Sequence, residues 1–161
     1  TGIRANVIKC ATEPAIDEMN ERVLRASARA HRQTGVPICT HTYPANRTGL
    51  DQQRVFKDEG VDLGRTVIGH SDDSDDIAYL EQIIENGSYC GMDRIGLPRP
   101  RTDEQRADMV GLADERIPQW NFTHIPKTII PMLRERGVSD ADIEQMTIKN
   151  PRAIFEKNRP Y

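Results

Sequence analysis

The stretch Thr66-Val67-Ile68-Gly69-His70 is a short apolar run that ends in a side chain able to bind a metal ion. Two earlier stretches have the same form: Asn6-Val7-Ile8-Lys9 ends in a lysine, and Val36-Pro37-Ile38-Cys39-Thr40-His41 ends in a histidine. The polar end residues stand at positions 9, 41 and 70, a spacing close to the roughly 30 residues of one strand, one helix and two loops. This repeat predicts that all three occupy the carboxyl ends of successive parallel strands.

The rest of the chain continues the alternation of strand and helix. We expect four strands, at residues 3–9, 36–40, 66–69 and 89–92. We expect helices from a start near residues 12–14 to residue 34, and at residues 49–59, 75–86, 104–115, 126–136, 139–146 and from residue 150. Residues 116–124 lack a strand-like apolar run, so a loop is expected in place of a fifth strand.

Apolar residues at helical spacing predict which helix faces are buried. In the first helix the predicted buried stripe is Ile16, Met19, Val23, Ala26 and Ala30. In the helix at 75–86 the predicted inward residues are Ile77, Leu80, Ile83 and Ile84. Strands that alternate with helices of this kind form parallel sheets.

Parallel strands in this alternation are typical of a (β/α)8 barrel, whose strand ends converge on the face that carries the active site. A complete barrel needs about 200 to 250 residues or more, whereas this chain has 161. We therefore interpret residues 1–161 as a single incomplete domain of the α/β class. The prediction is a partial (β/α)8 TIM barrel of about four parallel strands, followed by C-terminal helices.

Composition narrows the class of partner. The net charge is −3, with 22 basic and 25 acidic residues interspersed, which argues against nucleic acid or an anionic membrane and favours a small-molecule substrate. No apolar stretch approaches the roughly 18 residues of a membrane span, and residues 1–10 lack a signal-peptide core. Three cysteines without a CxxC spacing predict buried free thiols. We expect a cytoplasmic protein.

The two strand-end histidines are candidate metal ligands. A neutral imidazole is a good zinc ligand, and His41 and His70 could bind one ion from adjacent walls of a barrel mouth. The alternative is that each is a hydrogen-bonded core or rim histidine. His31 is expected on the surface and His124 at a helix entry, so neither is a candidate ligand.

Lys9 ends an apolar strand, which allows two interpretations. Its ammonium group could extend to solvent or pair with a carboxylate. Alternatively, a buried neutral amine could add carbon dioxide, and the carbamate oxygens could bridge two metal ions.

Acidic residues are dense from Gly69 to Asp76. Ser74 or Asp75 could cap the next helix, and Asp72 or Asp73 could be solvated. The other interpretation is that a carboxylate beside His70 orients the imidazole or relays a proton. Asp93-Arg94, at the next strand end, could be an internal ion pair or a contact to substrate oxygen.

Five motifs together resemble the phosphotriesterase-like lactonases of the amidohydrolase superfamily. They are Ile8-Lys9-Cys10-Ala11-Thr12, the pair Gly35-Val36-Pro37 and Thr40-His41-Thr42, Ile68-Gly69-His70-Ser71, Gly91-Met92-Asp93-Arg94 and Asn150-Pro151. The resemblance covers nearly the whole chain. It implies a (β/α)8 barrel with two divalent metal ions, zinc or else cobalt, manganese or iron, that hydrolyses lactones or organophosphate triesters with a metal-bridging hydroxide.

The same resemblance implies roles for individual residues. Lys9 matches the family's carbamylated bridging lysine, formed with carbon dioxide, and His41 and His70 match its strand-five and strand-six metal ligands. Asp73 resembles the relay carboxylate. The arginine at position 94 resembles the lactonase branch of the family. Arg94 is expected to contact the lactone or ester substrate.

The chain also departs from the family pattern. Nothing matches the family's His-x-His pair of strand one or its aspartate at the end of strand eight, and a deletion or omitted segment is indicated near 115–116. The outer strands of an incomplete barrel have unpaired backbone N–H and C=O groups, which predicts that the chain associates with a second copy as a homodimer. One alternative is therefore a non-catalytic barrel remnant that acts as a scaffold or self-associating module. Another is a mononuclear deaminase or amidase with an unmodified Lys9.

Overall fold

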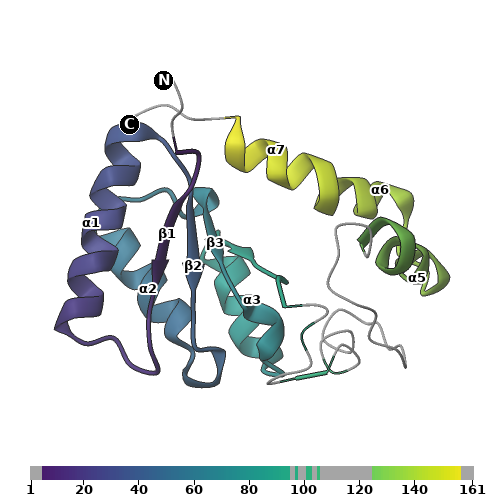
Figure 1. Ribbon diagram of the computed structural model, residues 1–161, viewed down its shortest axis with the longest axis horizontal. Helices are drawn as coiled ribbons and strands as arrows, with labels where there is room; N and C mark the ends of the chain where they lie inside the picture. Colours follow the sequence, from purple (N-terminus) through teal and green to yellow (C-terminus); the bar gives the residue numbers. More distant parts are fainter. Residues whose placement is uncertain (1–4, 95–96, 98–100, 103–104, 106–124, 157–161) are drawn as a thin grey trace.

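The computed structural model describes residues 5–94, 97, 101–102, 105 and 125–156. Its sheet has four strands in the order β1-β2-β3-β4, and every neighbouring pair is parallel. The strands are β1 (Ile8–Ala11), β2 (Ile38–His41), β3 (Thr66–Ile68) and β4 (Tyr89–Cys90). Figure 1 shows the strands side by side with their helices packed along one face. The predicted four parallel strands are confirmed.

Helices follow the first three strands and cover that face. They are α1 (Glu18–Thr34), α2 (Thr48–Asp58) and α3 (Ile77–Glu85), with short 3-10 turns η1 (Pro44–Asn46), η2 (Leu63–Arg65) and η3 (Ser71–Asp73) in the connections. Each helix packs against the next, α1 on α2 and α2 on α3. This repeat of strand, helix and parallel strand is the arrangement that makes up part of a (β/α)8 barrel.

A second group of helices lies beyond β4. It consists of the π-helical turn η4 (Ile125–Ile129), α5 (Ile130–Glu135), α6 (Asp140–Glu144), the π-helical turn η5 (Gln145–Lys149) and α7 (Asn150–Phe155). Ser139 caps α6, since its hydroxyl accepts a hydrogen bond from the backbone of Asp142, and Gly137 ends α5 with a φ of 84°. Both helix boundaries agree with the sequence prediction.

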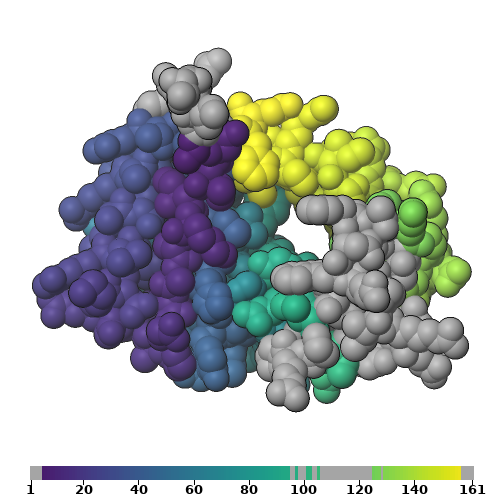
Figure 2. Space-filling model, viewed as in Figure 1, coloured from purple at the N-terminus to yellow at the C-terminus, as the bar shows by residue number. Residues whose placement is uncertain are grey.

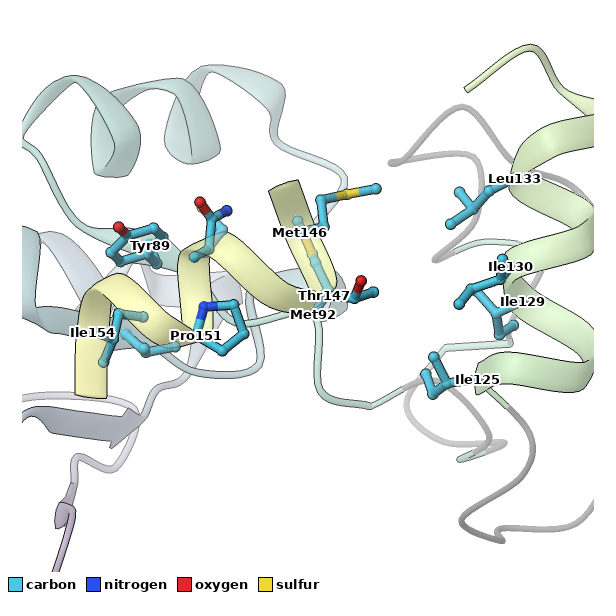
Figure 3. Close-up of a pocket in the computed structure, with 13 residues that line it drawn as sticks. Tyr89, Met92, Ile125, Ile129, Ile130, Leu133, Met146, Thr147, Pro151 and Ile154 are labelled. Carbon is cyan, nitrogen blue, oxygen red and sulfur yellow. The ribbon is translucent and has the colours of Figure 1, made fainter. Parts of the chain in front are cut away.

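The space between the sheet and these helices is an apolar cavity of about 370 Å³. Figure 2 shows the molecule hollowed there, between the strands and the helices of residues 125–155. In Figure 3, Ile130 and Leu133 face Met146 and Met92 across the gap, and Tyr89 closes one end. In the described part of the fold, an apolar space therefore separates β3 and β4 from the second group of helices.

Several predicted boundaries were wrong; β2 is Ile38–His41 and not 36–40, and β4 ends at Cys90 and not at residue 92. The first strand starts at Ile8 and runs to Ala11, so Lys9 is its second residue and not its last. Helix α1 begins at Glu18, because the Asp17 carboxylate accepts a hydrogen bond from the backbone N–H of Asn20 and caps the helix there. Residues 12–14 precede the helix instead of starting it.

The predicted buried face of α1 was also wrong. Met19 and Val23 are exposed at 65% and 43%, and Ala26 is exposed as well. The residues that face the sheet are Leu24, Ser27, Ala28 and His31. Close packing of a helix on a sheet accepts small side chains, and a polar side chain can join them when it is hydrogen-bonded. His31, expected on the surface, is completely buried.

In helix α3, too, only some of the apolar residues that were predicted to face inward are buried. Leu80 and Ile83 are buried as predicted, together with Tyr79 directly before Leu80, whereas Ile77 and Ile84 are each 60% exposed. The N-cap of α3 is Asp76, one position after the predicted candidates. Asp72, one of the two acids that could have been solvated, is completely buried.

Several predictions fall outside the described residues. They are the helix at 104–115, the loop at 116–124, the deletion near 115–116 and the position of His124, and all of them stay predictions. None of the described helices has the length and apolar character that crossing a bilayer requires.

Candidate functional site

The predicted strand-end histidines lie in contact. His41 is the last residue of β2, and His70 follows β3 by two positions. Nδ1 of His41 lies 2.7 Å from Nε2 of His70. The ring centroids are 4.4 Å apart and the rings are nearly perpendicular, at 88°. The structure thus brings together two of the three residues proposed as metal ligands.

Close backbone packing places His70 at this position. A Cβ on Gly69 would lie 2.1 Å from the carbonyl oxygen of Thr40, so only glycine lets β3 approach β2 here. The hydroxyl of Thr42 donates to the carbonyl of Gly69 over 2.7 Å. His70 itself has a φ of 62°, a left-handed conformation that is uncommon for a residue with a side chain and is often found at functional sites.

Asp93 orients His70. One oxygen of its carboxylate lies 2.8 Å from the backbone nitrogen of His70 and 2.8 Å from ring Nδ1. A carboxylate only accepts hydrogen bonds, so Nδ1 of a neutral His70 carries the proton and Nε2 is left as an acceptor for the Nδ1–H of His41. The sequence interpretation gave Asp93 no role at His70. Its signal in the sequence was its place directly after the predicted strand at 89–92, one βα unit beyond His70.

Lys9 occupies the same mouth from β1. Its register partner on β2 is Cys39, and its Nζ donates to the carbonyl of Thr40 over 2.8 Å and lies 3.9 Å from the Cys39 sulfur. The lysine side chain is exposed in the described fold. Among the described residues, the polar partners of Lys9 are therefore the Thr40 carbonyl and the Cys39 sulfur, and neither a carboxylate nor one of the histidines.

Arg94 is held by the acidic turn η3. Its backbone N–H donates to the Asp72 carboxylate over 3.0 Å, and its Nε lies 3.2 Å from an oxygen of Asp73. The Asp73 side chain is only 7% exposed, against 23% for Arg94. The internal ion-pair interpretation of Arg94 thus has a partner in Asp73, one of the proposed catalytic residues.

Charge and burial act together on the site's ionisable groups. Burial lowers the pKa of His41, and the nearby charges of His70, Arg94 and Lys9 lower it further. Burial acts to raise the pKa of Asp93, but the hydrogen bond and charge of His70 outweigh it, with a smaller part from Lys9, so the pKa is lowered. The site therefore favours a neutral His41 imidazole and an ionised Asp93.

The donor set fits a metal ion in part. Two nitrogen ligands on a tetrahedral zinc ion, with bonds of about 2.0–2.1 Å, lie roughly 3.3 Å apart, and the two facing nitrogens need only a small separation from 2.7 Å to reach that distance. Within the described ranges, however, no group of three His, Cys, Asp or Glu side chains is placed to hold an ion. The three predicted ligands, His41, His70 and Lys9, therefore do not by themselves make a complete set for a metal ion in the described part of the chain.

A comparison with protein families accounts for this arrangement. The model of the phosphotriesterase family matches residues 1–117 and 113–155 of the chain. The chain belongs to the phosphotriesterase family. The resemblance drawn from its strand-end motifs is confirmed at this level.

Individual relatives agree with the family assignment. A phosphotriesterase homology protein of Mycobacterium tuberculosis is 43% identical, and the alignment covers 100% of this chain and 58% of the relative. An aryldialkylphosphatase of Saccharolobus solfataricus is 34% identical, over 94% of this chain and 58% of that protein. The solved structure of the phosphotriesterase from Mycobacterium tuberculosis matches all of this chain with a TM-score of 0.90 and 43% identity.

The chain spans a little over half the length of these relatives. The solved structure is matched over 58% of its own chain, and the alignment with the Mycobacterium tuberculosis homology protein runs over 189 positions, against 161 residues here. The predicted partial barrel is confirmed. The relatives contain family sequence beyond what this chain supplies.

Proposed function

We propose that this chain is part of a metal-dependent hydrolase that cleaves an ester bond in a lactone or an organophosphate triester. The observation that carries the proposal is the chain of contacts from Asp93 through His70 to His41, built at the carboxyl ends of parallel strands in a member of the phosphotriesterase family. The proposal includes a small-molecule substrate, a cytoplasmic location and a homodimer.

Each residue has a proposed task. His41 and His70 would hold one divalent ion through the two nitrogens that now face each other, and Asp93 would keep the proton of His70 on Nδ1. Lys9, as a carbamate, would help to hold this ion and a second one. The bound ions would supply Lewis acidity and an activated water. This task is supported by the position of Lys9 on β1, the strand that pairs with the strand of His41, and by the bond from its Nζ to the carbonyl of Thr40.

Arg94 and Asp73 would act on the substrate side. The guanidinium of Arg94 could donate to a lactone or phosphoryl oxygen while Asp73 holds it in place through the 3.2 Å ion pair. Asp73 could then accept or pass on a proton as the ester opens.

Metal content per chain tests the proposal. Protein produced with bicarbonate and a divalent metal, then desalted, should contain about two ions per chain by elemental analysis if the ligands beyond this chain's own are supplied by a partner copy or further sequence. The Lys9→Ala variant should lose the binuclear content, whereas Lys57→Ala, an exposed lysine on α2, should retain it. His31 is unsuitable as a control because it is buried in α1.

A second candidate function is a non-catalytic barrel remnant that self-associates. The observation that favours it is the lack of a third acidic, cysteine or histidine ligand around His41 and His70 in the described fold. Metal content near zero, with equal results for wild type and Lys9→Ala, would support the remnant and rule out the hydrolase for this chain.

A further inference from the structure

Gln52 of helix α2 connects the two strands that carry Lys9 and His41. Its side chain is completely buried. Nε2 donates to the carbonyl oxygen of His41 and to the hydroxyl of Thr12, each over 2.8 Å. Thr12 directly follows β1, and its own backbone N–H also donates to the His41 carbonyl, over 3.1 Å. One amide group therefore fixes the ends of β1 and β2 relative to each other.

The neighbouring Gln53 makes equivalent bonds away from the site. It is 2% exposed, and its Nε2 donates to the carbonyl of Ile83 over 2.9 Å and to the hydroxyl of Ser88 over 2.7 Å. Ser88 precedes β4, so these bonds lie at the amino end of the sheet. Two adjacent buried glutamines thus form hydrogen bonds at opposite ends of the strands.

The two side chains differ in whether the carbonyl oxygen of the amide group has a hydrogen-bond partner. The carbonyl oxygen of Gln53 accepts a hydrogen bond from Asn86 over 2.9 Å. The carbonyl oxygen of Gln52 has no hydrogen-bond partner in the described part of the chain, and a buried acceptor without a partner destabilises the fold. Within the described residues, Gln53 thus has partners for both atoms of its amide group, whereas Gln52 is bonded only through Nε2, which points to the strand ends at the site.

We propose that Gln52 is a positioning residue that holds His41 at the distance and angle at which it meets His70. Fixing the carbonyl of His41 fixes the strand end from which its ring projects. The two bonds also tie this strand end to the end of β1, which lies two residues after Lys9. They therefore limit any shift of Lys9 relative to His41. The effect on metal binding rests on the proposed function, whereas the effect on the histidine pair does not.

The test compares Gln52→Met with Gln53→Met, because methionine retains the length of glutamine and removes its hydrogen bonds. In metal-free protein, proton and nitrogen NMR of the imidazole rings reports the contact between His41 and His70. The ring signals should shift in Gln52→Met and stay at their wild-type positions in Gln53→Met. Denaturant unfolding should show the reverse order, with the larger loss of stability in Gln53→Met.

Zinc affinity, measured by competition with a chelating dye, gives the second readout. Gln52→Met should weaken binding by about tenfold or more, the usual effect of removing a group that supports a metal ligand, and Gln53→Met should bind as wild type does. If wild type binds no zinc, the proposed function fails, and the ring NMR comparison still decides the role of Gln52.

Unchanged histidine signals in Gln52→Met, or equal changes in both variants, would overturn the proposal. Should Gln52→Met fail to fold, Gln52→Asn provides the same test, since its amide is too short to reach both acceptors. The same shift of the His41 and His70 signals is expected there.

Discussion

One carboxylate oxygen of Asp93 is shared by two nitrogens of His70, the backbone nitrogen and ring Nδ1, each at 2.8 Å. The backbone bond holds a residue in the left-handed conformation, and the ring bond sets the rotation and tautomer of its imidazole. A single side chain therefore fixes both the backbone and the ring of a proposed metal ligand.

Substitution of Asp93 should weaken metal binding with little change elsewhere. We expect Asp93→Ala to lower zinc affinity about 10- to 100-fold, as removal of a carboxylate behind a ligating histidine does. Asp93→Asn should lose less, because its amide oxygen can still accept from Nδ1. The control is Asp51→Ala, an exposed carboxylate on α2. Equal affinities of Asp93→Ala and Asp51→Ala would refute this role.

Gly69→Ala should disrupt the fold at the site. The new Cβ would stand 2.1 Å from the Thr40 carbonyl, so β2 and β3 must separate, at a cost of about 3 kcal/mol or more. Gly137→Ala serves as the control: no atom of the described residues lies within 4 Å of the added Cβ, but its φ is 84°, so a cost of about 1 kcal/mol is expected. Urea unfolding of both variants measures the difference, and similar values would contradict the close approach of the strands.

The burial of the His31 ring predicts that the protein loses stability in mild acid. Burial lowers its pKa below the ordinary 6.5, the nearby Arg65 lowers it further, and the hydrogen-bonded Val36 carbonyl and Asp62 compensate in part. As the pH falls through 6.5, His31 becomes protonated in the unfolded chain before it does in the folded chain. The free energy of unfolding therefore decreases. NMR titration of the His31 ring should give a midpoint below 6.5. A midpoint at or above 6.5 would show that the ring is not buried as a neutral group.

The cysteines should behave as unreactive free thiols. All three are unpaired in the structure. Burial raises the pKa of Cys10 to about 11 and also raises the pKa of Cys39 and of Cys90. Because the thiolate is the reactive form, a thiol reagent at pH 8 should label native protein slowly and urea-unfolded protein quickly. Fast labelling of native protein at Cys10 would contradict its burial against α1.

Spacing along the chain predicted the elements better than it predicted their faces. The interval from His41 to His70 follows from the length of one βα unit, and the structure places the two rings in contact. The buried face of α1 could not be predicted from apolar periodicity, because Ser27 and His31 are polar and the apolar Met19 is exposed. Which polar residues a helix buries depends on the carbonyls that the neighbouring strands offer, and this is not visible in one sequence.

The supporting residues of the site were missed for the same reason. Asp93 is 23 positions from His70, and Gln52 is 40 positions from Thr12, so each contact exists only once the strands are assembled. Neither residue type is unusual at its place in the sequence. The metal-ligand candidates could be found because each lies in or just after a short apolar strand, His41 at its end and His70 two residues past it. Their supports lie on a loop and on a helix.

The order of strands in the sheet has a consequence for how the site comes apart. The inner strands β2 and β3 each pair with a neighbour on both sides, whereas β1 pairs only with β2 in the described sheet. Sheets lose their outermost strand first when they open locally. Fraying of β1 would carry Lys9 away while His41 and His70 stay joined, so the amides of β1 should exchange with deuterium well before those beside the histidines.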